Sequence, residues 1–196
     1  MIPIINSKSD LKEYMKCDKR ALSIKRKFPI PFWDYVWKFE IYLRKHEYYA
    51  NKHNKNVFDK VMEVYYKFKH NRCGLKLGFS IPINTFGKGL RINHYGYIVV
   101  NKDAKIGEYC DIHQGVNIGQ NNSSEEVPII GDGVWIGPGA KIFGKINIDD
   151  FVAIGANSVV NNSFLEKNIT IAGIPATKIK ETGTHEMMVA SRYVKW

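Results

Sequence analysis

The second half of the chain carries aliphatic residues at a regular spacing of six. The series begins at Val100, is interrupted after Ile118, and resumes in the same phase from Ile130 to Val160. This period matches neither an α-helix nor a half-buried strand, and it predicts hexapeptide repeats wound into a parallel β-helix. All ten positions of the series are Ile or Val: Val100, Ile106, Ile112, Ile118, Ile130, Ile136, Ile142, Ile148, Ile154 and Val160.

Two further features of the repeat support a coiled β architecture. Gly, Asp or Asn follows the aliphatic residue in eight of the ten cases, and these residues permit the tight turn that each hexad requires. A second column of mostly small or aliphatic residues lies four positions after the first. Three hexads, or about 18 residues, would close one coil with the aliphatic residues stacked inside. We therefore expect a mostly β fold over residues 76–181.

The interruption reads GQNNSSEEVP and shifts the period by six residues. Its polar residues and glycine predict a loop, residues 119–129, that leaves one coil without breaking the stack. Such a loop on a rigid rod is well placed to contact a substrate. The alternative is a neutral insertion that a corner of the coil tolerates.

Residues 1–75 have a different pattern, which predicts an α-helical domain. One helix is expected over residues 31–49, and a second begins after Asn56, which can cap it. The second helix places Val57, Val61, Val64 and Phe68 on one face. The many aromatic residues of this region are interpreted as a packing surface. The tail, residues 182–196, shows no pattern that assigns it a structure.

The charge is concentrated in this helical domain. The chain has 196 residues and a net charge of +10, and residues 1–75 hold 17 Lys and Arg against 8 Asp and Glu. Basic surface can attract nucleic acid, anionic lipid, acidic glycans or phosphorylated cofactors, or it can simply be solvated. No nucleic-acid-binding motif accompanies it, so no nucleic-acid partner is predicted.

Cysteines and hydropathy indicate a cytoplasmic protein. The three cysteines, Cys17, Cys73 and Cys110, have no metal-ligand spacing and are expected to be reduced thiols. The N-terminal residues have no apolar run typical of a secretory signal, and no segment is long and apolar enough to span a membrane.

The repeat region resembles a known enzyme family. The segments FGKGLRINHYGYIVVNKDAKIGEYCDIHQGVNIG, VWIGPGAKIFGKINIDDFVAIGANSVV and IAGIPATKI are similar to the left-handed β-helix acyltransferases. The likeness is to the serine O-acetyltransferase branch and its relatives among surface-polysaccharide acetyltransferases. It implies a left-handed coil, a homotrimer, acetyl-CoA as co-substrate and no metal.

The resemblance also implies a catalytic base. His94, in INHYG, matches the family's catalytic histidine, and a neutral imidazole can accept the proton of a hydroxyl that attacks a thioester. His94 also falls where the six-residue period, continued backward from Val100, would require an aliphatic residue. His113 lies about one coil later and is a second candidate, either lining the site or lying at the surface.

Matching to the family points to the residues that contact coenzyme A. They are expected along a groove between neighbouring rods, with glycines allowing close approach and lysines meeting the adenosine phosphates. The predicted set is Gln120, Gly137, Pro138, Gly155, Ala156, Gly173, Lys178 and Lys180.

Three departures from the serine enzymes guide the choice of acceptor. Ser80 stands where they carry a carboxylate that orients the base, Val127 where they carry a second histidine, and the helical domain is shorter. These differences predict a sugar hydroxyl in surface-polysaccharide synthesis as the acceptor. Serine O-acetylation for cysteine synthesis is the alternative, and a non-catalytic β-helix scaffold that binds partners through its basic helices is a third hypothesis.

Overall fold

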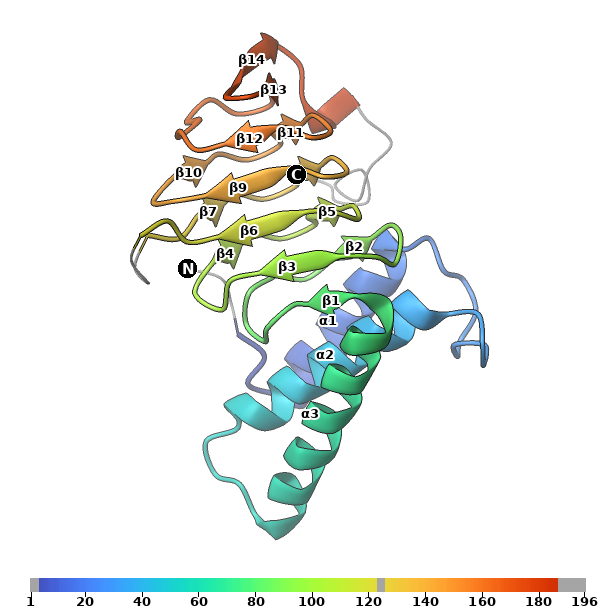
Figure 1. The fold of residues 1–196 in the computed structure, drawn as a ribbon. Helices are drawn as coiled ribbons and strands as arrows, with labels where there is room; N and C mark the ends of the chain where they lie inside the picture. The colour runs from blue at the N-terminus through green and yellow to red at the C-terminus, as the bar shows by residue number, and fades with distance from the viewer. Residues whose placement is uncertain (1–3, 123–125, 187–196) are drawn as a thin grey trace.

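The computed structural model describes residues 4–122 and 126–186, and its chain runs from a group of helices into a stack of short strands (Figure 1). The helices are α1 (Lys8–Ala21), α2 (Tyr35–Asn51) and α3 (Val57–Leu77). They lie together at one end of the strand stack. The centre of the predicted loop (123–125) and the end of the predicted tail (187–196) lie outside the described residues.

The strands form three sheets whose order follows successive turns of the chain. The orders are β1-β3-β6-β9-β12, β10-β7-β4 and β14-β13-β11-β8-β5-β2, and all pairs are parallel except the closing β13-β14 hairpin. A short 3₁₀ helix, η1 (Thr184–Glu186), follows the hairpin. The strand bounds are β1 (Phe79–Ser80), β2 (Arg91–Ile92), β3 (Ile98–Val100), β4 (Lys105–Ile106), β5 (Asp111–Ile112), β6 (Asn117–Gly119), β7 (Ile129–Ile130), β8 (Trp135–Ile136), β9 (Lys141–Phe143), β10 (Asn147–Ile148), β11 (Ala153–Ile154), β12 (Val159–Val160), β13 (Thr170–Gly173) and β14 (Ala176–Lys180).

The aliphatic series forms the centre of this coil, as the spacing predicts. All ten Ile and Val positions are buried, with at most 3% of their surface exposed. Ile112 pairs with Ile136 across the interrupted coil, whereas Ile136 pairs with Ile154 in the next one. The residues of the first pair are separated by six more positions than those of the second pair. These six extra residues leave the coil between β6 and β7. The core therefore passes the loop without a break.

The helices begin and end for local reasons. The Asn56 side chain caps α3 by accepting a hydrogen bond from the Asp59 N–H. The Asp59 carboxylate in turn accepts one from the Asn56 N–H. Gly78 ends α3 in the left-handed conformation, so that the helix reaches Leu77, two residues beyond the predicted limit of the helical domain. Helix α2 begins at Tyr35 instead of Pro31, because the chain turns through residues 31–33 before Asp34.

A buried ion cluster joins the helices to the first coil. Arg44, fully buried on α2, pairs with Asp18 and Glu47 at 2.7 and 3.0 Å. It also donates to the carbonyl oxygens of Phe86 and Gly87, and Asp18 accepts the backbone N–H groups of residues 89 and 90. An uncovered first coil would leave such groups without partners. The helical region therefore caps the rod through these polar contacts, and Phe39 and Leu43 of α2 belong to the same apolar core as the rod.

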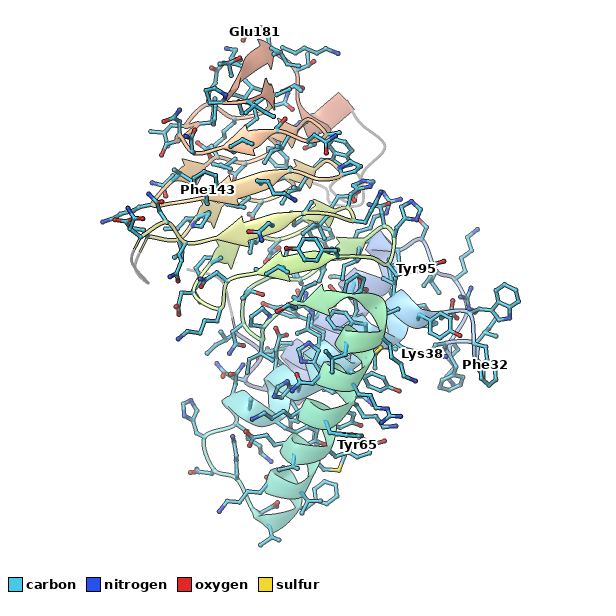
Figure 2. The ribbon with its side chains drawn as sticks, viewed as in Figure 1. Phe32, Lys38, Tyr65, Tyr95, Phe143 and Glu181 are labelled. Carbon is cyan, nitrogen blue, oxygen red and sulfur yellow. The ribbon has the colours of Figure 1, made fainter. Side chains whose placement is uncertain are left out.

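The aromatic residues of the helical region are only partly a packing surface. Phe39 and Trp37 are buried as expected, but Phe32 and Trp33 are each 80% exposed. Figure 2 shows Phe32 projecting outward from the segment between α1 and α2. The interpretation of all these aromatics as packing residues is wrong for this segment, which extends from the helices as a loop.

Candidate active site

The two candidate histidines lie side by side at one corner of the coil. His94 follows β2 and is exposed, and His113 follows β5 in the next coil. Their ring centroids are 6.4 Å apart. Trp135, one coil further along, packs edge-on against His113 with ring centroids 5.1 Å apart. Two imidazoles thus face a shared surface beside an aromatic wall.

A buried carboxylate organises the base of this corner. Asp111 is only 1% exposed and accepts hydrogen bonds from Arg91 Nη1, at 2.8 Å, and from Asn93 Nδ2. Burial raises the pKa of Asp111, while the charge of Arg91 opposes that rise. The Asp111 carboxylate therefore holds Arg91 and Asn93 in fixed positions beneath the histidines.

These contacts also fix the state of His113. Asn93 Nδ2 lies 3.1 Å from His113 Nε2, and a hydrogen bond donated by this amide corresponds to the tautomer that carries the ring proton on Nδ1. Desolvation lowers the pKa of His113, with Asp111 acting in the opposite direction. His113 is therefore a neutral ring at neutral pH, with Nδ1–H as its remaining donor.

The segment between α1 and α2 forms a pocket against His94. The pocket has a volume of about 260 Å³, and its polar lining includes Asp34, Asn93 and His94. Its walls are largely aromatic, with Trp33, Tyr35, Trp37 and Tyr95. Arg26 pairs with Asp34 through Nε at 3.1 Å, and the Ile30 N–H donates to the same carboxylate at 2.6 Å. A fixed carboxylate thus lies in an aromatic pocket beside the candidate base.

Most of the predicted coenzyme A contacts share the corner of the histidines. Gly137 and Gly155 follow β8 and β11, which neighbour each other in the sheet that contains β5, and Pro138 and Ala156 come directly after them. Gly173 ends β13 in the same sheet. The structure therefore places these residues in a row that continues upward from His113.

The glycines of this row have a structural cause of their own. A Cβ on Gly137 would lie 2.7 Å from the Ile154 carbonyl oxygen, and one on Gly155 would lie 2.7 Å from Ala172 Cβ. Both positions therefore require glycine for packing between coils, whether or not a ligand approaches them.

Gln120 and the lysines fall elsewhere. Gln120 follows β6 in a different sheet, where it accepts a hydrogen bond from Asn101, so one chain does not bring it to the row. Lys178, on β14, already pairs with Glu166 at 2.7 Å and Glu181 at 2.7 Å. Lys180 is exposed on the same strand and pairs with no carboxylate among the described residues.

The Ser80 hydroxyl does not take the place of an orienting carboxylate. Within the described residues no hydrogen bond joins Ser80 to the His94 ring, and Ser80 lines a separate pocket of about 790 Å³ beside His46 and His70. Four residues at this corner were not among those predicted from the sequence: Arg91, Asn93, Asp111 and Trp135. In the sequence, only their positions next to inward-facing aliphatic residues could have indicated them.

No described helix is long and apolar enough to cross a bilayer. No group of three or more His, Cys, Asp and Glu side chains in the described ranges is arranged to hold a metal ion.

The chain is similar to serine acetyltransferases. It is 37% identical over 104 residues to serine acetyltransferase of Synechococcus elongatus, which is 52% of this chain and 42% of that protein. The serine acetyltransferase of Brucella abortus in complex with coenzyme A has a TM-score of 0.70 at 27% identity, covering 90% of this chain and 70% of that one. The soybean enzyme complexed with serine has a TM-score of 0.68 at 25% identity, covering 87% and 70%. No family model matches the chain.

These findings correct the expected acceptor. A sugar hydroxyl in surface-polysaccharide synthesis is wrong as the main interpretation, because the relatives and the solved structures are serine acetyltransferases. Neither Ser80 nor Val127 lines the pocket beside His94, whose walls come from the α1–α2 segment and from the residues around His94. The chain spans about half the length of the curated relatives it matches. Within those limits, the similarities confirm the resemblance to hexapeptide-repeat acyltransferases and support its serine acetyltransferase branch.

Proposed function

We propose that this chain transfers the acetyl group of acetyl-CoA to the hydroxyl of L-serine. The observation that carries the proposal is the pocket that is lined by both His94 and the half-buried carboxylate of Asp34. The similarity to enzymes solved with coenzyme A and with serine supports it.

His94 is the proposed general base. Its ring accepts the proton of the serine hydroxyl as the serine oxygen bonds to the acetyl carbon. The carbon–sulfur bond then breaks, and the imidazolium returns the proton to the sulfur of coenzyme A. His113 lies beside His94 and, as a neutral ring, carries one N–H group that would donate to the acceptor or to the thioester oxygen.

Asp34 is the residue proposed to recognise the acceptor. A carboxylate in a pocket of aromatic rings suits an ammonium group, since the carboxylate offers a charge-assisted hydrogen bond and the rings offer cation–π attraction. Arg26 holds Asp34 in place and lies over the Trp37 ring, 5.7 Å from its centroid. An amino acid with a short hydroxyl side chain would place its oxygen toward His94.

The proposed path of coenzyme A follows the row from His113 toward β14. Gly137, Pro138, Gly155, Ala156 and Gly173 would contact the pantetheine, and Lys180 the phosphates. Lys178 is the weaker phosphate ligand of the two because its ammonium group is already neutralised by two carboxylates.

We further propose a left-handed coil and a homotrimer. Gln120 lies at another corner of the same chain, so a groove between neighbouring copies is the arrangement that would bring it to the row. The resemblance implies both the left hand and the three-fold assembly.

The test is release of coenzyme A thiol from acetyl-CoA with a panel of acceptors. L-serine should give the fastest release, whereas N-acetyl-L-serine, which lacks the ammonium group, and N-acetylglucosamine should give little. Asp34→Asn should raise KM for serine by about tenfold or more with kcat much less affected, because a charge-assisted hydrogen bond is lost. Asp103→Asn, at an exposed turn of the rod, is the matched control. Faster turnover of the sugar than of serine would refute the proposal.

A further inference from the structure

The segment between α1 and α2 carries large apolar side chains that are exposed. Phe32 and Trp33 are each 80% exposed, Phe28 is 70% exposed, and Ile30 is 45% exposed. Single exposed apolar residues are ordinary on protein surfaces, whereas a group of large ones marks a contact surface. These four residues are named here the apolar tip. Figure 2 shows Phe32 projecting farther from the body of the molecule than Lys38.

The apolar tip is built on a turn that would favour glycine. The Ile30 carbonyl accepts the Trp33 N–H at 3.5 Å across Pro31 and Phe32, and Phe32 has a φ of 70°. Proline in the second position and a left-handed third residue are features of a type II β-turn, whose third residue is usually glycine or asparagine. A phenylalanine in this conformation is disfavoured. Because the Phe32 ring is exposed, packing within the described chain does not compensate for that conformation.

Polar contacts behind the apolar tip hold it in place. Asp34 accepts hydrogen bonds from Arg26 Nε at 3.1 Å and from the Ile30 N–H at 2.6 Å. Lys38, on α2, donates from Nζ to the Ile30 carbonyl oxygen at 2.8 Å. The segment is thus fixed without its exposed side chains, which remain available for a partner.

Basic residues surround the apolar tip. Residues 16–38 hold seven Lys and Arg against two Asp, and both aspartates are paired with arginines. Lys19, on α1, donates to the Lys25 carbonyl oxygen at 3.4 Å, so the basic end of α1 lies against the segment. The cations of this stretch that pair with no carboxylate among the described residues are Lys16, Lys19, Arg20, Lys25, Lys27 and Lys38.

Exposed aromatic rings among unpaired cations match the surface of an anionic bilayer. Aromatic side chains partition to the boundary between headgroups and acyl chains, and Lys and Arg are attracted to negative headgroups. The apolar tip projects from the molecule, which suits insertion into a soft surface. A single-stranded nucleic acid also takes cations and aromatic rings, but it is bound along a groove. The shape of the segment therefore favours the bilayer.

We propose that this segment docks the chain on anionic membranes, with the apolar tip inserted among the headgroups and the surrounding cations against the lipid phosphates and carboxylates. Trp33 also lines the pocket that contains His94, so docking brings that pocket close to the membrane surface. Docking of this kind is a peripheral contact. The inference goes beyond the proposed function and does not depend on its acceptor or its chemistry.

The first experiment measures binding of the full chain to lipid vesicles by cosedimentation. Phosphatidylcholine vesicles with about 30% phosphatidylserine should bind the chain, and binding should fall as salt rises. Phe32→Ser should weaken that binding by at least about fivefold, because the ring no longer leaves water. Phe58→Ser, at an exposed aromatic position of α3, is the control and should bind like the wild type. Circular dichroism checks that both variants fold. A folded Phe32→Ser variant that binds as tightly as the wild type overturns the inference.

Charge reversal separates local docking from the general attraction of a chain whose net charge is +10. Lys27→Glu, beside the apolar tip, should weaken binding to the same vesicles by about tenfold or more. Lys145→Glu changes the net charge equally at an exposed position of the rod and should have little effect. Equal losses for the two variants would show that only the net charge determines binding, and the inference would be wrong.

The second experiment tests insertion of the apolar tip. Phe32→Trp should add a tryptophan whose emission shifts to shorter wavelength with anionic vesicles and is quenched by brominated lipids, since the indole enters the interface. The wild-type spectrum is subtracted, and Phe58→Trp should show neither effect. Absence of both effects for Phe32→Trp in a vesicle-bound sample contradicts insertion.

A single-stranded oligonucleotide tests the alternative partner. If it binds the chain more tightly than anionic vesicles do at the same salt, and Phe32→Ser weakens that binding, the segment binds nucleic acid and the proposal is wrong.

Acetylation of L-serine without vesicles separates this inference from the proposed function. Phe32→Ser should acetylate serine like the wild type, because Phe32 does not line the pocket that contains His94. A wild-type chain that binds vesicles but does not acetylate serine would refute the proposed function and leave the docking inference standing.

Discussion

The rod and the helical region both carry periodic apolar residues, yet the two periods have different outcomes. In the rod, all ten members of the six-residue series are buried. In α3, the members of the helical series are exposed, and the buried residues of that helix include Asp59, His70 and Gly74. A hexad fixes where its aliphatic residue points because each coil covers the one before it. A helical period shows only that a face exists and does not say what covers it.

The two regions also differ in how they are joined. Stacked aliphatic side chains hold the rod, whereas the helices are joined to its first coil both by apolar side chains such as Phe39 and Leu43 and by the charged and backbone groups around Arg44. The residues of the proposed active site also come from both regions. The rod supplies His94 and His113, and the segment between the first two helices supplies Asp34.

The largest effect is expected from removing the base that the rod supplies. His94→Ala should lower kcat by about a hundredfold to ten-thousandfold, since the acceptor hydroxyl then lacks a general base. Coenzyme A affinity, measured by titration, should be nearly unchanged because the proposed contacts lie further along the rod. His113→Ala is the companion variant. If it abolished turnover while His94→Ala did not, the assignment of the base would be reversed.

The junction between the regions should be sensitive to a single side chain. Arg44→Ala leaves Asp18 and Glu47 buried without their partner and should destabilise the fold by about 3–5 kcal/mol. Urea unfolding measures the change. Arg20→Ala, at an exposed position of α1, is the control and should alter stability by less than about 0.5 kcal/mol. A loss for Arg44→Ala as small as that of the control would show that the ion cluster does not hold the cap.

Truncation of an apolar side chain should cost much more stability in the core of the rod than in the segment between α1 and α2. Ile136→Ala opens a cavity in the stacked core and should cost about 2–5 kcal/mol. Phe28→Ala removes a side chain that is 70% exposed in the segment between α1 and α2, and should cost less than about 0.5 kcal/mol. Equal losses in urea unfolding would mean that the exposed loop is packed in solution.

The sequence predicts the rod well because its period is a local property of every coil. It also singles out His94, where a polar residue breaks that period. It does not predict the contacts of Asp111, since outward residues of the coil follow no period. Nor does it predict that Asp34 and His94 line one pocket, because that pocket joins segments about sixty residues apart and depends on how the helices cap the rod.

The smallest effect concerns a buried acid at the junction. Glu40 accepts the Ile92 N–H through Oε1 at 3.3 Å, while Oε2 is buried and has no partner among the described residues. Burial raises the pKa of Glu40 well above its ordinary value of 4.5, and the nearby charge of Asp18 adds to the rise while Arg44 opposes it. The folded state thus keeps a proton that the unfolded state loses above pH 4.5, so this group lowers stability as pH rises through that window. Glu40→Gln imitates the protonated acid and should be more stable than the wild type at pH 8 and equal to it near pH 4.5, as measured by urea unfolding. Glu181→Gln, at a side chain that is 78% exposed, should show no such gain. A variant less stable than the wild type at pH 8 would mean that Glu40 is ionised in the folded chain and belongs to the Arg44 cluster as a third carboxylate partner.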